Sequence, residues 1–369
     1  MQYLKGFTAM KINQFIKEYV SKDYGGSTPS GCVLDCSLGV NPAPPPGFVL
    51  EKLSTISGEI IKNYPHDETL LHKLIRRFSG VARLAPENLL LGNGSYDILC
   101  NLNLLCLGRG KTVLGHAPQF PAYVDHVHCI GANYRFYAMQ AQHNYRFDAD
   151  GYIALMDEHC DMFIVENPNN PTGQVIAIAD MERIAKRALE LDTVLVVDEA
   201  YGDYMPLANS AIRLIENYPN VVVTRSFSKG FGLAGIRLGY AASSPELIAQ
   251  FRKLQLSFNC NGVARELACA LLESGVDVPR AEQTAQTKVH VLACLHKFRA
   301  AHTCPVTPIL TIYCEDEATD LQALLARAGL GAVGCAGYEG LGKNAARLMM
   351  CDDAELLVSL LEKAQGMPR

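Results

Sequence analysis

One lysine lies among residues suited to binding an anion. Lys229 follows Ser226 and Ser228 and precedes several glycines, with Arg237 eight positions later. The β-branched run just before it, residues 221–224, predicts a buried strand. Hydroxyl groups and a guanidinium can bind a phosphate, while a lysine amine can form an imine with an aldehyde. The stretch therefore indicates a site for a phosphate-bearing aldehyde cofactor.

Two other phosphate-binding patterns fail on context. Gly230, Gly232 and Gly235 fit G-x-G-x-x-G after a predicted strand. A dinucleotide site would also need an acidic residue about 20 positions later, at the end of the next strand. Residues 251–254 are instead Phe-Arg-Lys-Leu, a basic stretch with a helical pattern. Residues 110–112, Gly-Lys-Thr, match the end of a P-loop motif. That motif also requires a glycine at position 105, where this chain has Leu105.

The lysine stretch resembles the lysine motif of fold-type I pyridoxal-phosphate (PLP) enzymes, the aspartate aminotransferase superfamily. It is most similar to the histidinol-phosphate aminotransferase and threonine-phosphate decarboxylase branch. The resemblance implies that Lys229 carries the cofactor as an aldimine and that Ser226, Ser228 and Arg237 bind its phosphate. For the motif alone, a Gly-rich turn with a solvated lysine is the alternative. The resemblance extends over about residues 33–365.

A second glycine-rich turn follows the predicted strand 89–91 and precedes the predicted helix 98–107. Free N–H groups at a helix start, together with the helix dipole, attract an anion. The turn resembles the family's G-N-G-S-x-E sequence, which implies that Gly94, Ser95 and Tyr96 complete the phosphate site. A plain strand–turn–helix connection is the alternative.

Two segments could hold the pyridine ring of such a cofactor. Phe120 follows the predicted strand 112–114, and the resemblance places its ring against the pyridine face. Packing of Phe120 in the core is the alternative. The Asn-Pro-Asn-Asn-Pro-Thr-Gly sequence at 167–173 ends a strand, where α/β folds place ligands. From this loop the Asn170 amide can donate to the phenolic oxygen O3′ of the cofactor.

The apolar predicted strand 193–197 ends in Asp198, and a buried carboxylate needs a matching charge. The protonated pyridine nitrogen would supply it, so that the ring can withdraw electrons. Tyr201 could donate to the same O3′ oxygen. A buried helix-capping aspartate is the alternative, but Asp198 precedes Lys229 at the family's spacing. Lys229, Asp198 and Tyr201 are therefore the predicted catalytic residues.

Other residues are assigned to the substrate side. The segment 33–42 resembles a family strand that lies beside the bound substrate, which implies a role for Asn41 and also for Asn170. Arg347 begins a predicted strand and can clamp a substrate α-carboxylate with two hydrogen bonds; a surface-strand arginine is the alternative. Tyr64, before a proline, resembles the family's tyrosine that reaches from a neighbouring subunit to the cofactor phosphate. A half-buried turn tyrosine is equally compatible.

Strands alternate with helices from 89 to 240, which predicts an α/β fold with a mostly parallel sheet between two helix layers. With the resemblance, this gives a three-layer PLP-transferase domain and a smaller α+β domain. The expected division is an N-terminal segment at 1–45, a large PLP-binding domain at 46–255 and a small domain at 256–369. Residues 278–302 are expected to form one long helix.

Bulk properties exclude several classes of protein. The chain has 369 residues, 49% hydrophobic, with a net charge of -5 and no basic block, so nucleic acid is not an expected partner. No apolar run approaches the ~20 residues of a membrane span, and no signal-peptide core begins the chain. Thirteen cysteines are scattered without a Cys-x-x-Cys pair. We therefore expect a reduced, cytoplasmic protein without disulfides or a metal site.

Three functions are compatible with these residues. The first is a PLP-dependent aminotransferase that moves the amino group of an amino acid to a 2-oxo acid. The second is a decarboxylase or oxidase of the same fold. The third is a PLP-binding regulator, which the intact Lys229 and the lack of a DNA-binding module disfavour. The first is preferred, in a homodimer with shared active sites that Tyr64 would complete.

One departure from the family bears on the substrate. In the phosphate-substrate branches, an arginine on the strand before the cysteine/glycine loop helps to bind the substrate phosphate. Residues 331–338 of this chain contain no arginine. A phosphate dianion without a second cation would be poorly held. The sequence therefore predicts an unphosphorylated amino-acid substrate.

Overall fold

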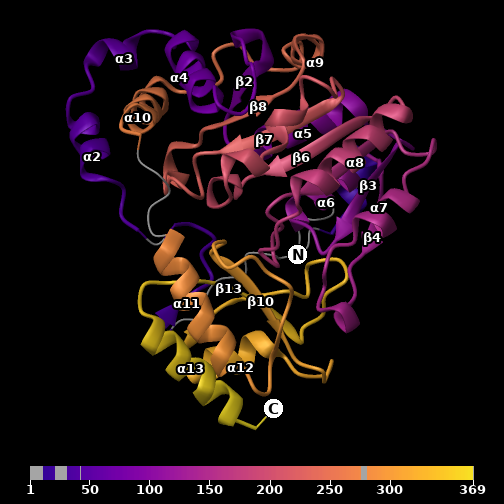
Figure 1. Ribbon diagram of the computed structural model, residues 1–369, viewed down its shortest axis with the longest axis vertical. Coiled ribbons are helices and arrows are strands. Elements are labelled where there is room, and N and C mark those ends of the chain that lie inside the picture. Colours follow the sequence, from indigo (N-terminus) through magenta and orange to yellow (C-terminus); the bar gives the residue numbers. More distant parts are fainter. Residues whose placement is uncertain (1–10, 21–30, 42, 276–280, 369) are drawn as a thin grey trace.

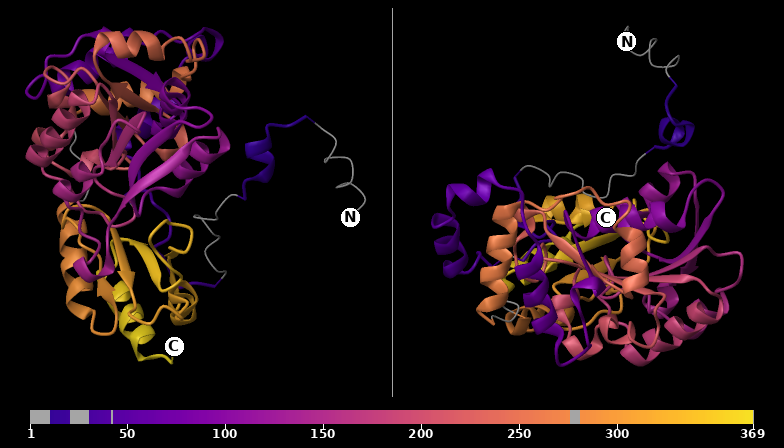
Figure 2. Two further views of the ribbon diagram at one scale, coloured as in Figure 1. Left: turned by 90° about the vertical axis from the view of Figure 1, so that its right-hand side faces the viewer. Right: turned by 90° about the horizontal axis from the view of Figure 1, so that it is seen from above.

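The computed structural model describes residues 11–20, 31–41, 43–275 and 281–368. These residues form two lobes, a larger one around a seven-stranded sheet and a smaller one around a four-stranded sheet (Figure 1). The two lobes lie one above the other in the side view (Figure 2).

The sheet of the large lobe is mostly parallel, which confirms the predicted α/β class. Its strand order is β2-β8-β7-β6-β5-β3-β4, and β8 alone runs antiparallel to its neighbours. The strands span β2 Leu89–Gly92, β3 Thr112–Ala117, β4 Asn133–Ala138, β5 Met162–Glu166, β6 Val194–Glu199, β7 Val221–Ser226 and β8 Gly239–Ala242.

Alternate residues of the central strands face two separate apolar cores. On β6, Leu195 and Val197 join one core, and Val196 joins the other. The first core contains residues of α4 (Glu68–Phe78), α8 (Ile178–Glu190) and α10 (Gly262–Glu273); the second contains residues of α5 (Ser95–Cys106), α6 (Pro121–Cys129) and α9 (Pro245–Phe251). Each fully buried Leu or Val contributes about 1.5–3 kcal/mol. Burial on both faces explains why these strands read as continuous apolar runs.

The small lobe is built on an antiparallel sheet of order β12-β13-β10-β9. Its elements are β9 Arg299–Ala300, β10 Ile309–Tyr313, β12 Val333–Gly334, β13 Ala345–Met349, α11 Ala281–Cys294, α12 Leu321–Ala328 and α13 Ala354–Gly366. A further pair, β1 Leu34–Asp35 with β11 Leu330–Gly331, runs parallel. Through β1 the N-terminal segment packs with the small lobe.

The expected long helix over 278–302 is wrong at its C-terminal end, because α11 ends at Cys294 and residues 299–300 belong to β9. After the helix, the chain is bound by the buried side chain of Gln365. Its Oε1 accepts hydrogen bonds from the backbone N–H groups of His296 and Lys297, both at 2.8 Å. This contact joins residues about 70 positions apart, which local sequence patterns do not reveal.

The packing of α10 bears on the second domain boundary, which the sequence analysis places at residue 255. The helix packs against α2 (Gly47–Ser54) and α4, and its Leu267 and Leu271 belong to the core of the large lobe. We therefore propose to keep the division near residue 45 and to move the later one beyond residue 273.

The parallel strands bring their carboxyl ends together at the edge that faces the small lobe (Figure 1). In the register of β5, β6 and β7, Glu166 lies beside Asp198, and Asp198 lies beside Thr224. Loops that start here converge on one region, as the strand–helix alternation predicts.

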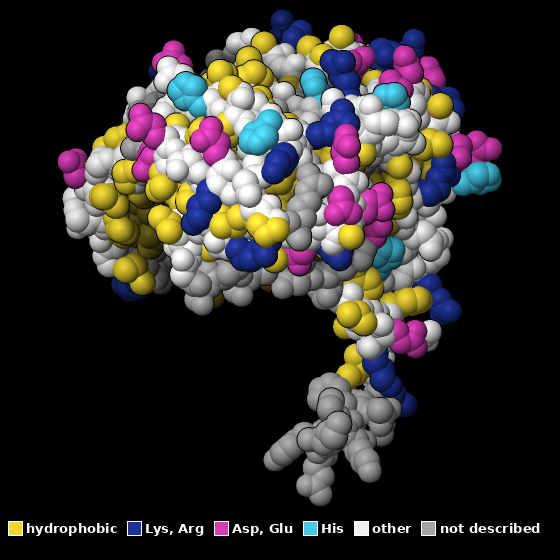
Figure 3. All heavy atoms as spheres, turned by 90° about the horizontal axis from the view of Figure 1, so that it is seen from below, with side chains coloured by type: hydrophobic (Ala, Val, Ile, Leu, Met, Phe, Trp, Pro, Cys, Tyr) yellow, Lys and Arg dark blue, Asp and Glu magenta, His cyan; other side chains and the backbone are white. Residues whose placement is uncertain are grey.

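Four further features of the described residues concern membrane-spanning helices, metal sites, cysteines and surface charge. Within the described ranges, no helix is both long and apolar enough to cross a membrane, and no three His, Cys, Asp or Glu side chains are grouped as a metal site. All thirteen cysteines are free thiols. On the face drawn in Figure 3, basic and acidic side chains are interspersed.

Candidate active site

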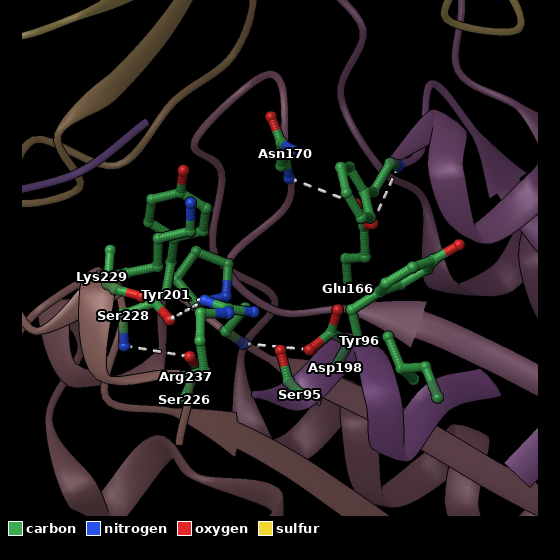
Figure 4. A pocket seen from close by; sticks show the side chains of 15 residues that line it. Ser95, Tyr96, Glu166, Asn170, Asp198, Tyr201, Ser226, Ser228, Lys229 and Arg237 are labelled. Carbon is green, nitrogen blue, oxygen red and sulfur yellow. Dashed lines mark hydrogen bonds between the residues drawn. The ribbon is translucent and has the colours of Figure 1, made fainter. Parts of the chain in front are cut away.

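A cleft with a cavity volume of about 190 Å³ opens at the carboxyl edge of the large sheet. Figure 4 shows its polar lining. The predicted residues that line it are Ser95, Tyr96, Phe120, Asn170, Asp198, Tyr201, Ser226, Ser228, Lys229 and Arg237. The strands and turns that carry them are far apart in sequence, and the fold brings them to one cleft.

One end of the cleft is suited to a phosphate. Arg237 Nη1 lies 3.4 Å from Ser228 Oγ, to which it donates, and Ser226 Oγ accepts from the Ser228 N–H at 3.0 Å. Gly94 caps α5 with φ 88°, and a Cβ there would lie 2.8 Å from Arg237 Nη2. Only glycine combines this backbone conformation with the approach of the guanidinium. The helix start, two hydroxyls and one cation form an anion cradle.

Aromatic side chains form one wall of the cleft. The rings of Tyr96 and Phe120 meet edge to face, with centroids 5.9 Å apart, and the Tyr96 hydroxyl donates to the Ala122 carbonyl at 2.9 Å. That hydrogen bond fixes Tyr96 at the start of α5. Phe120 also packs against the second core, so core packing and cleft lining, the two alternatives for this residue, both occur.

Asp198 is a buried carboxylate without a cation at salt-bridge distance in the described part of the chain. It accepts hydrogen bonds from Thr224 Oγ1 at 2.9 Å and from the Ala200 N–H at 3.1 Å. Burial raises its pKa to about 6, although these hydrogen bonds and Lys229 act in the opposite direction. A cationic ring nitrogen would supply the missing charge, so this carboxylate fits the pyridine of PLP.

The Lys229 amine lies at the cleft and has one hydrogen-bond partner in the described part of the chain. Its Nζ donates to the Gly39 carbonyl at 2.6 Å, and the Tyr201 hydroxyl donates to the same oxygen at 3.3 Å. A Cβ on Gly39 would lie 2.9 Å from the Tyr201 hydroxyl, so only glycine lets the N-terminal segment approach so closely. The sequence analysis missed Gly39, whose contact depends on pairing across 190 residues.

Arg347 is a buried guanidinium with no carboxylate partner among the described residues. Nη1 donates to Asn170 Oδ1 at 3.1 Å and Nη2 to the Ser37 carbonyl at 2.8 Å, while Nε has no hydrogen-bond partner. Burying an unpaired cation is costly. The arrangement therefore fits a carboxylate ligand that arrives with the substrate.

Four predicted residues, Gly94, Asn41, Tyr64 and Arg347, are not among the residues that line the cleft; of these, Gly94 lies beside Arg237 and Arg347 donates to Asn170, both of which line it. Asn41 Nδ2 donates to the Gly230 carbonyl at 2.7 Å, so Asn41 joins the N-terminal segment to the loop after Lys229. Tyr64 is 73% exposed and stacks on Phe258 with centroids 4.6 Å apart. Within one chain neither side chain lines the cleft.

Glu166 and Thr224 are polar cleft-region residues that the sequence analysis did not single out. Glu166 lines the cleft, and Thr224 holds Asp198. Glu166 could have been found, because it ends an apolar strand in a carboxylate in the same way as Asp198. Thr224 lies inside a β-branched run, and nothing in the run distinguishes it from its neighbours.

Comparisons with known proteins agree with this geometry. A family model described as aminotransferase class I and II matches residues 36–298. The histidinol-phosphate aminotransferase of Citrifermentans bemidjiense is 31% identical over 272 residues, which are 73% of this chain and 68% of that protein. The enzyme of the same name from Stutzerimonas stutzeri is 35% identical over 235 residues, 62% of this chain and 61% of that protein.

Solved structures share the fold. The histidinol-phosphate aminotransferase of Sinorhizobium meliloti, in complex with pyridoxal-5'-phosphate, has a TM-score of 0.77 at 21% identity and covers 97% of this chain and 98% of its own. The L-threonine-O-3-phosphate decarboxylase of Porphyromonas gingivalis has a TM-score of 0.77 at 19% identity, with 91% of this chain and all of its own covered. At such identities the likeness extends to the fold alone.

Proposed function

The chain belongs to the aminotransferase class I and II family, and we propose that it transfers the amino group of an unphosphorylated amino acid to a 2-oxo acid. Its cofactor is PLP, and it is a PLP-dependent aminotransferase. The observation that carries the finer proposal is the buried guanidinium of Arg347, which has no carboxylate partner among the described residues and beside which the neighbouring strand presents a neutral residue, Val333.

Different cleft residues would bind different parts of the cofactor. Ser226, Ser228 and Arg237, with the N-terminus of α5, would bind the phosphate, and Phe120 would cover a face of the ring. Asp198 would keep the ring nitrogen protonated. When bound, PLP supplies an electron-withdrawing ring that stabilises negative charge at the substrate Cα.

Lys229 is the proposed base. Its amine faces the cleft and is held by one carbonyl, that of Gly39, so it can leave this partner when substrate arrives. It would take the proton from Cα and return it to C4′ of the cofactor, as general base and then general acid. Tyr201 and Asn170 would donate to the O3′ oxygen of the cofactor.

Arg347 is the proposed clamp for the substrate α-carboxylate. Its contacts with Ser37 and Asn170 fix the guanidinium plane between the N-terminal segment and the cofactor loop. Because the group is buried, a carboxylate would meet it in a medium of low dielectric, where the attraction is stronger than in water. The fixed two-pronged geometry and the buried, water-excluded surroundings both favour arginine over lysine.

The neighbourhood of Arg347 supports an unphosphorylated substrate. β12 pairs with β13 so that buried Val333 lies opposite Arg347, and residues 331–338 contain neither lysine nor arginine. Arg347 lies behind the cleft-lining Asn170, and the cations of the lining itself are Lys229 and Arg237, both of which are assigned to the cofactor. A substrate phosphate would therefore lack the second cation that a dianion needs.

Histidinol phosphate is the competing substrate, because several relatives at 31–35% identity carry that name. A decarboxylase uses the same cofactor residues, so product analysis separates it. We would scan the purified holoprotein against free amino acids, histidinol phosphate and threonine phosphate, and follow the conversion of the aldehyde form of the cofactor to its amine form. The proposal predicts conversion by a free amino acid with formation of a keto acid. A thousandfold preference for a phosphorylated amine, or release of CO₂, would contradict it.

We further propose a cytoplasmic homodimer. The thirteen free thiols support a reducing compartment. Tyr64 is exposed and stacks on the exposed ring of Phe258, and we propose that this aromatic pair meets a second copy and that Tyr64 reaches the partner's phosphate cradle. Mixed dimers of Y64A and K229A should recover activity that neither variant has alone, because one cleft per dimer would be intact. Absence of recovery in verified mixed dimers would contradict the shared site.

A further inference from the structure

The end of β5 carries a buried carboxyl group that has no role in the proposed reaction. Glu166 is 3% exposed and lines the cleft beside Asp198, its neighbour in the β5–β6 register. No lysine or arginine lies within salt-bridge distance of it in the described part of the chain. A buried acid without a cation is costly, so its contacts must justify its presence.

Glu166 accepts hydrogen bonds from two loops that face the cofactor site. Oε1 accepts from the Phe120 N–H at 2.9 Å, and Oε2 accepts from the Asn170 N–H at 3.2 Å and from Asn169 Nδ2 at 3.0 Å. Figure 4 shows the line that connects Glu166 with Asn170. The Glu166 carboxyl thus links the backbone of Phe120, the proposed cover of the cofactor ring, to the backbone of Asn170, the proposed donor to O3′.

The charge on this carboxyl is set by its surroundings. Burial, and then the neighbouring Asp198 carboxylate, raise the pKa of Glu166 well above its ordinary value, against the three hydrogen bonds. Two adjacent buried carboxyl groups cannot both ionise cheaply. Burial thus disfavours a second negative charge beside Asp198, the carboxylate that a cationic ring nitrogen would need.

We propose that Glu166 is a positioning residue of the cofactor site: by accepting from the Phe120 and Asn170 backbones, its carboxyl sets the gap between them in which the cofactor ring lies. This inference rests on the proposed assignment of the cleft as the PLP site. Glu166 itself acts through Phe120 and Asn170 and needs no contact with the substrate.

The next strand offers a matched control. Glu199 ends β6 as Glu166 ends β5, is 1% exposed, and accepts from Ser210 Oγ at 2.7 Å and from the Ala211 N–H at 2.6 Å. It does not line the cleft. E199Q therefore removes an acceptor oxygen from a buried carboxyl, together with the counter-charge of Arg225 at 3.7 Å, away from the cofactor.

The test compares PLP binding to the apoproteins of wild type, E166Q and E199Q, by absorbance titration, together with the unfolding midpoint of each. Glutamine has one acceptor oxygen, so in E166Q an amide NH₂ would face one of the backbone N–H groups. We expect E166Q to weaken PLP binding by about tenfold or more and to shift the absorbance maximum of the bound cofactor. E199Q should lower the unfolding midpoint and leave both cofactor readouts at their wild-type values.

An E166Q protein with wild-type affinity and an unshifted absorbance maximum would overturn the inference. If E166Q does not fold, E166D and E199D replace the pair, because aspartate keeps both acceptors on a shorter arm. Failure of both Glu166 variants to fold beside folded Glu199 variants would also overturn it, by making the role purely structural. A wild-type protein that does not bind PLP through Lys229 would refute the proposed function instead, and so the two failures are distinguishable.

Discussion

Two lysines, one in each lobe, have opposite surroundings for their amines. Lys229 in the large lobe faces the cleft and donates to a single carbonyl, that of Gly39. Lys288 on α11 is fully buried, and its Nζ contacts four oxygens at 2.8–3.1 Å, those of Thr303, Cys304, Thr307 and Ile309. The Lys288 amine, whose hydrogen bonds are all made within the protein, stabilises the fold. An amine with one partner and an open cleft is left for a ligand.

Two arginines of the sheets repeat this contrast. Arg347 has no carboxylate partner in the described chain and keeps an unpaired Nε. Arg225 on β7 is also buried and also has nitrogens without a hydrogen-bond partner, Nε and Nη1, but it has Glu199 at 3.7 Å and Asp203 at 3.3 Å. Burial alone therefore does not identify a functional cation; between these two arginines, the absence of an internal counter-charge distinguishes Arg347.

The largest expected effect separates the two lysines. K229A should lower transamination by about a thousandfold or more, because it removes the proposed acid–base group. K288M should retain most of the activity but lose about 1–3 kcal/mol of stability, since its four oxygens lose their donor. Steady-state rates and urea unfolding of both variants measure this. If K288M were as inactive as K229A while still folded, the contrast would be false.

The arginines give a second, smaller test. R347K should raise the KM for the amino acid, with a loss of about a hundredfold in kcat/KM, because lysine cannot offer the two-pronged contact. R225K should reduce stability and leave that KM near the wild-type value. Substrate titrations of both variants provide the measurement. A normal KM in R347K would remove Arg347 from the substrate site.

The smallest effect is a pH dependence of stability. Burial lowers the pKa of Lys288 to about 7, whereas in the unfolded chain the amine keeps its proton up to about pH 10. Between these values the unfolded state binds more protons, so the free energy of unfolding should rise with pH, by up to about 1.4 kcal/mol per unit. K288M should lack this slope. Equal slopes in the two proteins, measured by urea unfolding from pH 7 to pH 10, would contradict a neutral buried amine.

The sequence sufficed for the parts of the site that follow strands. Asp198, Asn170 and Lys229 each come after an apolar run, so a parallel sheet had to bring them to one edge. The same rule would have found Glu166. Gly39 could not be found, because its role depends on a hydrogen bond to a residue 190 positions away.

Other features depend on partners that the primary structure does not specify. The saturation of Lys288 comes from a loop 15 to 21 residues further along the chain, and an isolated lysine in a helical pattern reads as a solvated one. Tyr64 lies outside the cleft of its own chain, so its assignment requires a second molecule. The roles of both residues depend on tertiary or quaternary contacts, which a sequence motif does not encode.

The central claim is that the cleft lysine, and not the saturated one, carries the cofactor. Borohydride reduction of the PLP-loaded protein, followed by peptide mapping, tests it most directly. The account predicts one pyridoxyl label, on Lys229, and none on Lys288. A label on any other lysine, or no label in a protein that has bound PLP, would contradict it.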